Sequence, residues 1–432
     1  MHNPFSSCKV RAASVTCFAG ITSSVFFSLV QEKRGFILSA VIYAAKHDEV
    51  PSVRSAACRA IGVISCFPQV FNSAEILDKL IHAVEINTRD PSVSVRITAS
   101  WALANLCDSV RHAIDTFALE GSTDHNAVSE SLALLTACAL RLSNDGDKIK
   151  SNAVRALGNL SRFVKCTTHP GFHDKIMDKT ALSLKTNSPD ELPSTSDCEG
   201  SNRCASNIFC PASLGVGDSR WFERTVQALI SCVTTGNVKV QWNVCHALSN
   251  LFLNETLRLQ EMDWASSVFS ILMLLLRDSS NFKIKIQAAV ALAVPSSVLD
   301  YGNSFSDIVR GLLHLMENLG SDQISVPSSF KYRVALDNQL TSTLLHVLSL
   351  ASSTDNEPLK AFLVKKASFL EDWLKGLCLS FLASSTQPLV GNIGNQKKEI
   401  ICKAICSLTE LYNGVKQFPI AQKFEELEKS IQ

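Results

Sequence analysis

The 432-residue sequence lacks an excess of charge of either sign, with 41 Lys and Arg residues against 40 Asp and Glu residues. A protein dedicated to nucleic acid normally carries a basic excess, so this balance argues against a nucleic-acid partner. Long apolar runs are also missing, because the longest, Val268–Leu276, is too short to span a bilayer and is interrupted by Ser270. Residues Met1–Arg11 contain no apolar core of a signal peptide. We therefore expect a protein of the cytoplasm, the nucleus or both, with no membrane partner.

Motifs of catalysis and metal binding are missing as well. The sequence has no Gly-rich phosphate loop, no G-x-S-x-G and no H-E-x-x-H. Zinc ligands usually occur in close pairs with two to four residues between them, whereas the candidates Cys198, Cys204 and Cys210 are six residues apart in a Ser/Asn-rich region, with His169 and His173 upstream. We expect no metal, cofactor or small-molecule ligand and a protein that is not an enzyme. A catalytic site assembled from distant residues would leave no motif and remains the alternative.

The fifteen cysteines do not form a disulfide pattern. Their odd number favours a reducing compartment. Many occur within apolar helical patterns, where a cysteine acts as a small buried hydrophobe. These are Cys58, Cys107, Cys138, Cys232, Cys245, Cys402 and Cys406.

One stretch, Asp90–Leu106, has the pattern of a turn followed by an amphipathic helix. Its template, Val95-Arg96-x-x-Ala99-x-x-Ala102-Leu103-Ala104, recurs from Val10, Val53, Ile149, Val240 and Ile284, and more weakly near Tyr332 and Lys398. A spacing of about 42–44 residues, seen between several copies, is typical of HEAT and armadillo repeats. The sequence therefore predicts an all-α, right-handed α-solenoid of HEAT/armadillo-like repeats, with about seven to nine helical hairpins.

The segments between the templates show the apolar spacing of partner helices, and no segment has the alternation of a strand. The predicted partner helices are Glu75–Val84, Val128–Leu142, Trp221–Val233, Trp264–Arg277 and Phe305–Asn318.

The repeats fall into two groups, residues 1–165 and 219–432. The region between them, 166–218, is rich in Ser, Thr, Asn, Asp, Gly and Pro, which predicts a disordered insertion with at most a short helix at Asp174–Leu184. The first template begins at Val10 with little chain before it to supply a partner helix. We therefore expect the C-terminal part of a longer array, or a short isoform.

A basic residue follows the first apolar residue of most templates, as in Arg11, Arg54, Arg96, Lys150, Lys285 and Arg333. These residues would either bind phosphate or acidic peptides, or form a ladder of ion pairs between neighbouring repeats. Because Asp48, Asp90 and Asp147 lie a few residues before three of the templates, we favour the ladder.

An asparagine occupies one position near the end of three template helices, in Asn105, Asn159 and Asn250. Four residues earlier, on the same helical face, stand Trp101, Arg155 and His246. The motif Trp101-Ala-Leu-Ala-Asn105 resembles the armadillo-repeat signature of importin alpha. In that family the Asn row holds the main chain of a bound peptide, and the Trp row stacks on its basic side chains. Only one unit here keeps both residues, which argues against a Lys/Arg-rich ligand.

We predict that these six residues line the concave face and bind an extended segment of a partner protein. An amide is both donor and acceptor, so the three asparagines have an alternative role as braces to the backbone of the neighbouring repeat.

The runs Val53–Gly62 and Ile149–Leu160 resemble the family of HEAT repeat-containing protein 6, which implies an α-solenoid. Together, the patterns predict a non-enzymatic protein-interaction scaffold. A nuclear-transport-like adaptor and a non-catalytic subunit of an enzyme complex are the alternatives.

Overall fold

A computed structural model describes residues 7–71, 73–120, 125–164, 219–319, 327–352, 354, 356–384 and 391–431. Within these ranges every regular element is a helix, which confirms the predicted all-α class. The predicted insertion 166–218 lies outside the described residues.

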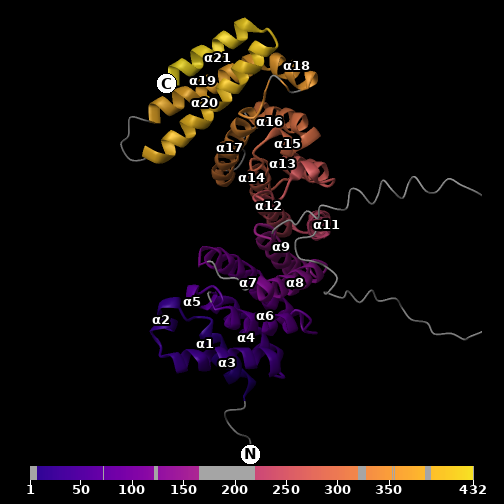
Figure 1. The fold of residues 1–432 in the computed structure, drawn as a ribbon, viewed down its shortest axis with the longest axis vertical. Helices are drawn as coiled ribbons and strands as arrows, with labels where there is room; N and C mark the ends of the chain where they lie inside the picture. Colours follow the sequence, from indigo (N-terminus) through magenta and orange to yellow (C-terminus); the bar gives the residue numbers. More distant parts are fainter. Residues whose placement is uncertain are drawn as a thin grey trace, which may run out of the picture.

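The repeated template forms one row of helices, which we call the template row. Its members are α1 (Cys8–Phe18), α4 (Pro51–Ile64), α7 (Val93–Glu120), α9 (Asp147–Ser161), α12 (Val238–Phe252), α14 (Phe282–Leu292), α17 (Pro327–Leu348) and α20 (Gly391–Gly414). Each member contacts the next, and the helices follow one another along an elongated array (Figure 1). Helix α9 packs directly against α12, so the stack continues from one side of residues 165–218 to the other.

A second row covers one side of the template row. It comprises α3 (Gln31–His47), α6 (Ala74–Asn87), α8 (His125–Leu142), α11 (Ser219–Thr235), α13 (Ala265–Asp278), α16 (Phe305–Leu319), α19 (Ala367–Ser384) and α21 (Phe418–Ile431). Shorter helices are α2 (Ser23–Ser28), α5 (Pro68–Phe71), α15 (Val298–Tyr301) and α18 (Glu357–Lys365). All five partner helices predicted from the sequence are confirmed. Helix pairs such as α3–α4, α6–α7 and α13–α14 form the hairpins of a solenoid.

The template residues explain why neighbouring helices stack so closely. The first apolar residue of the template is at most 1% exposed in Val53, Val95, Ile149, Val240 and Ile284. Only small side chains permit backbones to approach closely, and the template supplies buried alanines and glycines at the contact. Val10 is the exception: it is 50% exposed, because α1 has no earlier template helix packed against it among the described residues.

The predicted ladder of ion pairs is confirmed in the first repeats. Nε of Arg11 lies 2.9 Å from Asp48, that of Arg54 lies 2.7 Å from Asp90, and that of Arg96 lies 2.8 Å from an aspartate. The aspartate paired with Arg96 is Asp145, whereas the sequence had suggested Asp147. Asp145 stands in the turn before α9 and also accepts a hydrogen bond from the N–H of Gly146.

The ladder changes where the chain resumes after residues 165–218. Lys150 donates to the Thr235 hydroxyl at 3.1 Å, and Lys285 donates to the Arg277 carbonyl at 3.0 Å. These basic residues therefore join successive turns through oxygens other than carboxylates, and neither forms an ion pair with an aspartate that the structure describes.

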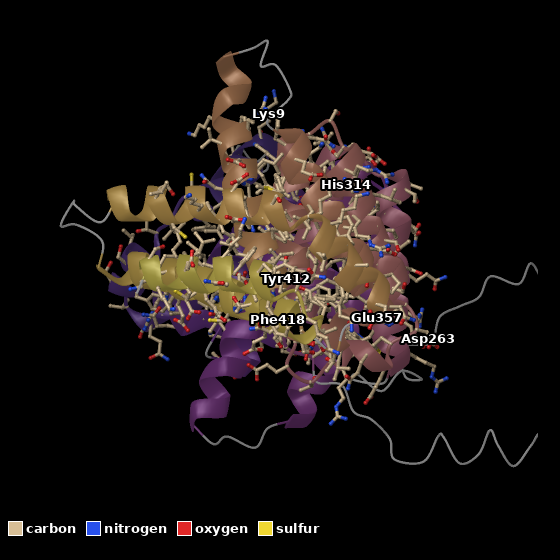
Figure 2. All side chains as sticks on the ribbon, turned by 90° about the horizontal axis from the view of Figure 1, so that it is seen from above. Lys9, Asp263, His314, Glu357, Tyr412 and Phe418 are labelled. Carbon is tan, nitrogen blue, oxygen red and sulfur yellow. The ribbon has the colours of Figure 1, made fainter. Side chains whose placement is uncertain are left out.

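Aromatic side chains fill the core between the last two helices, α20 and α21. Tyr412 and Phe424 are fully buried with ring centroids 5.1 Å apart, and the Tyr412 hydroxyl donates to the carbonyl of Leu363 at 3.1 Å. Figure 2 looks down on this end, with Tyr412 near the middle of the projection. Among the described helices, none combines the length and apolar character needed to cross a membrane.

The cysteines largely follow the prediction. Cys58, Cys107, Cys138, Cys232 and Cys245 are buried, whereas Cys402 and Cys406 are only half-buried. Burial raises the pKa of the Cys58 and Cys245 thiols to about 12, so they are protonated at neutral pH.

Stability should decrease in acid because of the ladder carboxylates. The hydrogen bond from Arg96 holds the pKa of Asp145 below its ordinary value. At Asp48 burial acts in the opposite direction, but the bonds from Arg11 and the Val50 N–H outweigh it and also lower the pKa. A lowered native pKa stabilises the fold above the unfolded-state value of about 3.9, and this stabilisation is lost as the pH falls through the native pKa. Urea unfolding between pH 6 and pH 2.5 should show this loss, and Arg96→Ala should make the dependence flatter. An unchanged profile in Arg96→Ala would contradict the assignment.

Candidate functional site

One template position presents a basic or aromatic side chain on four successive stacked helices. It is occupied by Arg59 in α4, Trp101 in α7, Arg155 in α9 and His246 in α12. The guanidinium carbon of Arg59 lies 5.5 Å from the centre of the Trp101 ring, which is cation–π geometry. The Trp101 ring lies against Gly62, where an added Cβ would be 2.6 Å from Cζ3 of the ring. Gly62 thus provides the space that lets the indole lie on α4.

Asn105 links the α4–α7 contact to α9. Its Nδ2 donates to the carbonyl of Gly62 at 2.8 Å, and its Oδ1 accepts a hydrogen bond from Nη2 of Arg155 at 2.5 Å. The residue is only 6% exposed. Its amide therefore bridges three successive template helices and holds Arg155 in place.

The other two asparagines divide between two roles. Asn159 repeats the bond of Asn105, donating from Nδ2 to the carbonyl of Ala104 at 3.1 Å. Asn250 differs, because its Nδ2 lies 3.3 Å from Nδ1 of His246 in its own helix. Two of the three predicted asparagines therefore bind the backbone of the neighbouring helix, which is the bracing geometry.

Braces of this kind are common in the template row. Side-chain donors reach carbonyls of the preceding template helix or the turn that follows it, as in Ser109 to Ser65 at 2.8 Å, Asn243 to Ser151 at 2.7 Å, Asn254 to Ser161 at 2.8 Å and Thr343 to Ala289 at 3.0 Å. A buried donor that needs a partner fixes the axial position of one helix against the next. The row of asparagines thus belongs to a wider system that sets the register of the stack.

His246 continues the row onto α12. Partial burial, together with the positive charges of Arg155 and Arg162, lowers its pKa, so the imidazole is neutral at physiological pH. We call Arg59, Trp101, Arg155, Arg162 and His246 the strip. Among the described residues, none of its three arginines forms an ion pair with a carboxylate, and Arg59 and Arg162 are exposed.

Sequence reasoning missed Arg59 and Arg162. Arg59 stands at the same template position as Trp101, but its helix has Val63 instead of the asparagine, so a search for the Trp/Asn pair passes over it. Arg162 follows the end of α9 and has no counterpart in the motif. Following the position of Trp101 alone through every template, without requiring the asparagine, would have found Arg59.

The pair Asn105 and Asn250 offers a matched test of bracing, because both are buried to the same degree. Asn105→Ala should lower the free energy of unfolding by about 1–2 kcal/mol, since Arg155 loses its acceptor and the Gly62 carbonyl loses the shortest of its side-chain hydrogen bonds. Asn250→Ala removes only a bond to a partly exposed histidine in the same helix and should cost less than about 0.5 kcal/mol. Urea unfolding followed by far-ultraviolet circular dichroism measures both. Equal losses would refute the distinction.

The side chains of the strip are suited to binding another molecule. Its parts are cationic donors suited to carboxylates and an indole face suited to apolar or cationic groups. No cluster of three potential metal ligands is found in the part of the chain that the structure describes.

Comparisons with known proteins assign no activity to the chain. No protein-family model matches the chain. An uncharacterized protein of Dictyostelium discoideum is 26% identical over 424 residues, covering 80% of this chain and 27% of that protein. The chain therefore spans about a quarter of the length of this relative.

Two solved structures show a distant similarity to the chain. An engineered protein is 15% identical with a TM-score of 0.44, covering 99% of this chain and 95% of that one. A designed armadillo repeat protein in complex with the peptide (KR)4 is 16% identical with a TM-score of 0.40, covering 68% of this chain and 95% of that one. At these TM-scores the similarity carries no argument about fold or function. By its own helix order and stacking, the chain is an α-solenoid of HEAT/armadillo-like helical repeats.

Proposed function

We propose that the chain is a non-enzymatic scaffold that binds an extended segment of a partner protein along the strip, on the concave face of the solenoid. The observation that carries this proposal is the continuity of the strip. Side chains of four stacked helices follow one another from Arg59 to His246, and the strip includes two exposed arginines. Stacked repeats present equivalent residues at regular intervals, which suits a ligand in extended conformation.

The residues of the strip favour an acidic segment. The arginines of the strip, which pair with no described carboxylate, offer paired donors to Asp, Glu or a phosphorylated residue, while Trp101 gives an apolar platform. Within the site, we assign Asn105 and Asn159 to positioning, because their amides already bind neighbouring carbonyls. Direct contact with the partner falls to Trp101, Arg155 and His246, with Asn250 beside them.

A nuclear-transport-like adaptor is the weaker alternative. Such an adaptor takes Lys/Arg-rich segments, which the arginines of the strip would repel. A non-catalytic subunit of an enzyme complex would use the same surface and differs only in the partner. Membership of the HEAT repeat-containing protein 6 family and a location in the cytoplasm or nucleus remain part of this proposal. The raised pKa of the buried Cys58 and Cys245 thiols argues against either of them as a nucleophile.

Charge reversal at the two exposed arginines tests the proposal. The double variant Arg59→Glu/Arg162→Glu changes the strip, and Lys148→Glu/Lys375→Glu makes the same change of charge at exposed positions of α9 and α19. Affinity purification from native cells should recover a set of proteins with the wild type and the lysine variant, and lose it with the arginine variant. Segments of those proteins should then bind the purified chain in calorimetry. If the arginine variant recovers the same proteins while melting normally, the strip is not the binding surface.

A further inference from the structure

A groove of about 710 Å³ lies beyond the strip, at the N-terminal ends of three template helices. Val238 and Trp242 come from the first turns of α12, Phe282 from the start of α14, and Tyr332 from the first turns of α17. Residues far apart in the sequence thus meet because the template helices all begin on the same side of the stack.

The groove is lined by large apolar side chains that remain exposed. Val238 is 50% exposed, Tyr332 42% and Trp242 37%, while Phe282 is half-buried between them. Single exposed apolar residues are ordinary on a protein surface, but a group that lines one hollow is typical of a binding site. Tryptophan and tyrosine are also the residues that most often anchor protein interfaces.

The charged side chains among the described residues that line the groove are both lysines. Lys239 and Lys283 are both exposed at its edge, and the ammonium of Lys283 lies 5.7 Å from the centre of the Tyr332 ring. Among the described residues, no carboxylate lines the groove and neither lysine forms an ion pair. A ligand that neutralises these ammonium groups must be acidic.

The helix ends themselves are already capped. Oδ1 of Asn237 accepts hydrogen bonds from the N–H groups of Lys239 and Val240 at 3.0 and 3.2 Å, and Oδ1 of Asn281 accepts from Lys283 at 3.0 Å. These backbone donors, which could otherwise hold a phosphate, are therefore in use. What the groove presents to a ligand is two lysine side chains above an aromatic surface.

We propose that this groove is a second docking site, for a segment of a partner protein in which one large apolar side chain is flanked by Asp and Glu residues. The apolar side chain lies between Trp242 and Tyr332, and the flanking carboxylates contact Lys239 and Lys283. The site is separate from the strip and does not depend on the function proposed for it.

Fluorescence anisotropy with the full chain tests this proposal. The probe is a fluorescein-labelled peptide with one phenylalanine flanked on each side by three acidic residues. Lys239→Glu/Lys283→Glu should weaken binding by about tenfold or more, because two attractive contacts become repulsive. Lys148→Glu/Lys375→Glu has the same net charge and should bind like the wild type. Trp242→Ala should also weaken binding, and circular dichroism confirms that each variant is folded.

Three further measurements test which surface binds the peptide and which kind of ligand occupies the groove. A peptide with serine in place of phenylalanine should bind at least about fivefold more weakly, because it loses the apolar contact. Arg59→Glu/Arg162→Glu should bind the parent peptide normally, which separates this proposal from the strip. The proposal is overturned if the parent peptide does not bind, if the serine peptide binds equally well, or if loss occurs only in the arginine variant. Displacement of the peptide by a single-stranded oligonucleotide at lower concentration than by unlabelled peptide would assign the groove to nucleic acid instead.

Discussion

Replacing Gly158 by alanine should lower the free energy of unfolding by about 2–3 kcal/mol, although it adds a single methyl group. Gly158 lies in α9 at its closest approach to α12. An added Cβ would lie 2.7 Å from both Cα and Cβ of Ala247. Because one of these atoms belongs to the backbone, no side-chain rotation relieves the overlap, and the two helices must separate.

The matched control is Gly35→Ala in α3, where an added Cβ meets no atom within 4 Å. Alanine there removes the entropic cost of a helical glycine and should raise the stability by about 0.5–1 kcal/mol. Urea unfolding by circular dichroism gives both values, and hydrogen exchange should localise the loss in Gly158→Ala to α9 and α12. Equal effects of the two substitutions would show that the α9–α12 approach is looser than described.

This contact also matters for the strip. Helices α9 and α12 carry Arg155 and His246, and their separation would interrupt the row between these two residues. Gly158→Ala should therefore also reduce recovery of any partner that binds along the strip, whereas Gly35→Ala should not.

Much of the fold was predictable because its cause is local and repeated. The template places apolar residues on one helical face and small residues where the next helix packs, and each strong copy became a helix of the same row. The ladder of Arg–Asp ion pairs was predictable because arginine and aspartate recur at fixed positions relative to the template. The third aspartate was misassigned because two aspartates lie close together here, Asp145 in the turn before α9 and Asp147 as the first residue of α9, and only the geometry of the turn selects Asp145.

The site was predictable only in part. The sequence indicated that Trp101, Asn105 and Arg155 share a helical face, but an amide serves equally as a brace or a ligand. The choice depends on the distance between helices, which places Nδ2 of Asn105 at 2.8 Å from the Gly62 carbonyl. The groove near Trp242 and Tyr332 left no signal at all, because it is formed by helix ends that are distant in the sequence.

Arg54→Ala should be the most damaging change in the ladder, with a loss of about 3–5 kcal/mol. The Asp90 side chain is only 6% exposed and lies 2.7 Å from Nε of Arg54. Nη1 of Arg54 also donates to the carbonyls of Asp48 and Glu49, both at 2.9 Å. Truncation therefore leaves a buried carboxylate without its cation, and two carbonyls without a donor.

The exposed pair of Arg277 and Asp278 provides the control. Their side chains are 64% and 56% exposed, so Arg277→Ala should cost less than about 1 kcal/mol. Arg54→Lys should be intermediate, because an ammonium keeps the charge but cannot bind the carboxylate and both carbonyls in the same planar arrangement. Urea unfolding of the three variants measures this order.

A double-mutant cycle then separates the ion pair from the other bonds of Arg54. Asp90→Ala removes the buried charge, so Arg54→Ala should cost less in that background than in the wild type. The difference measures the coupling between the two side chains, and the residual cost measures the bonds to the Asp48 and Glu49 carbonyls. We expect a coupling of about 1.5–3 kcal/mol, as for a hydrogen bond between charged groups in a buried setting. A coupling near zero would mean that Arg54 stabilises the repeat through its bonds to the two carbonyls alone, and that Asp90 serves only the turn before α7, where it accepts a hydrogen bond from the N–H of Ser92.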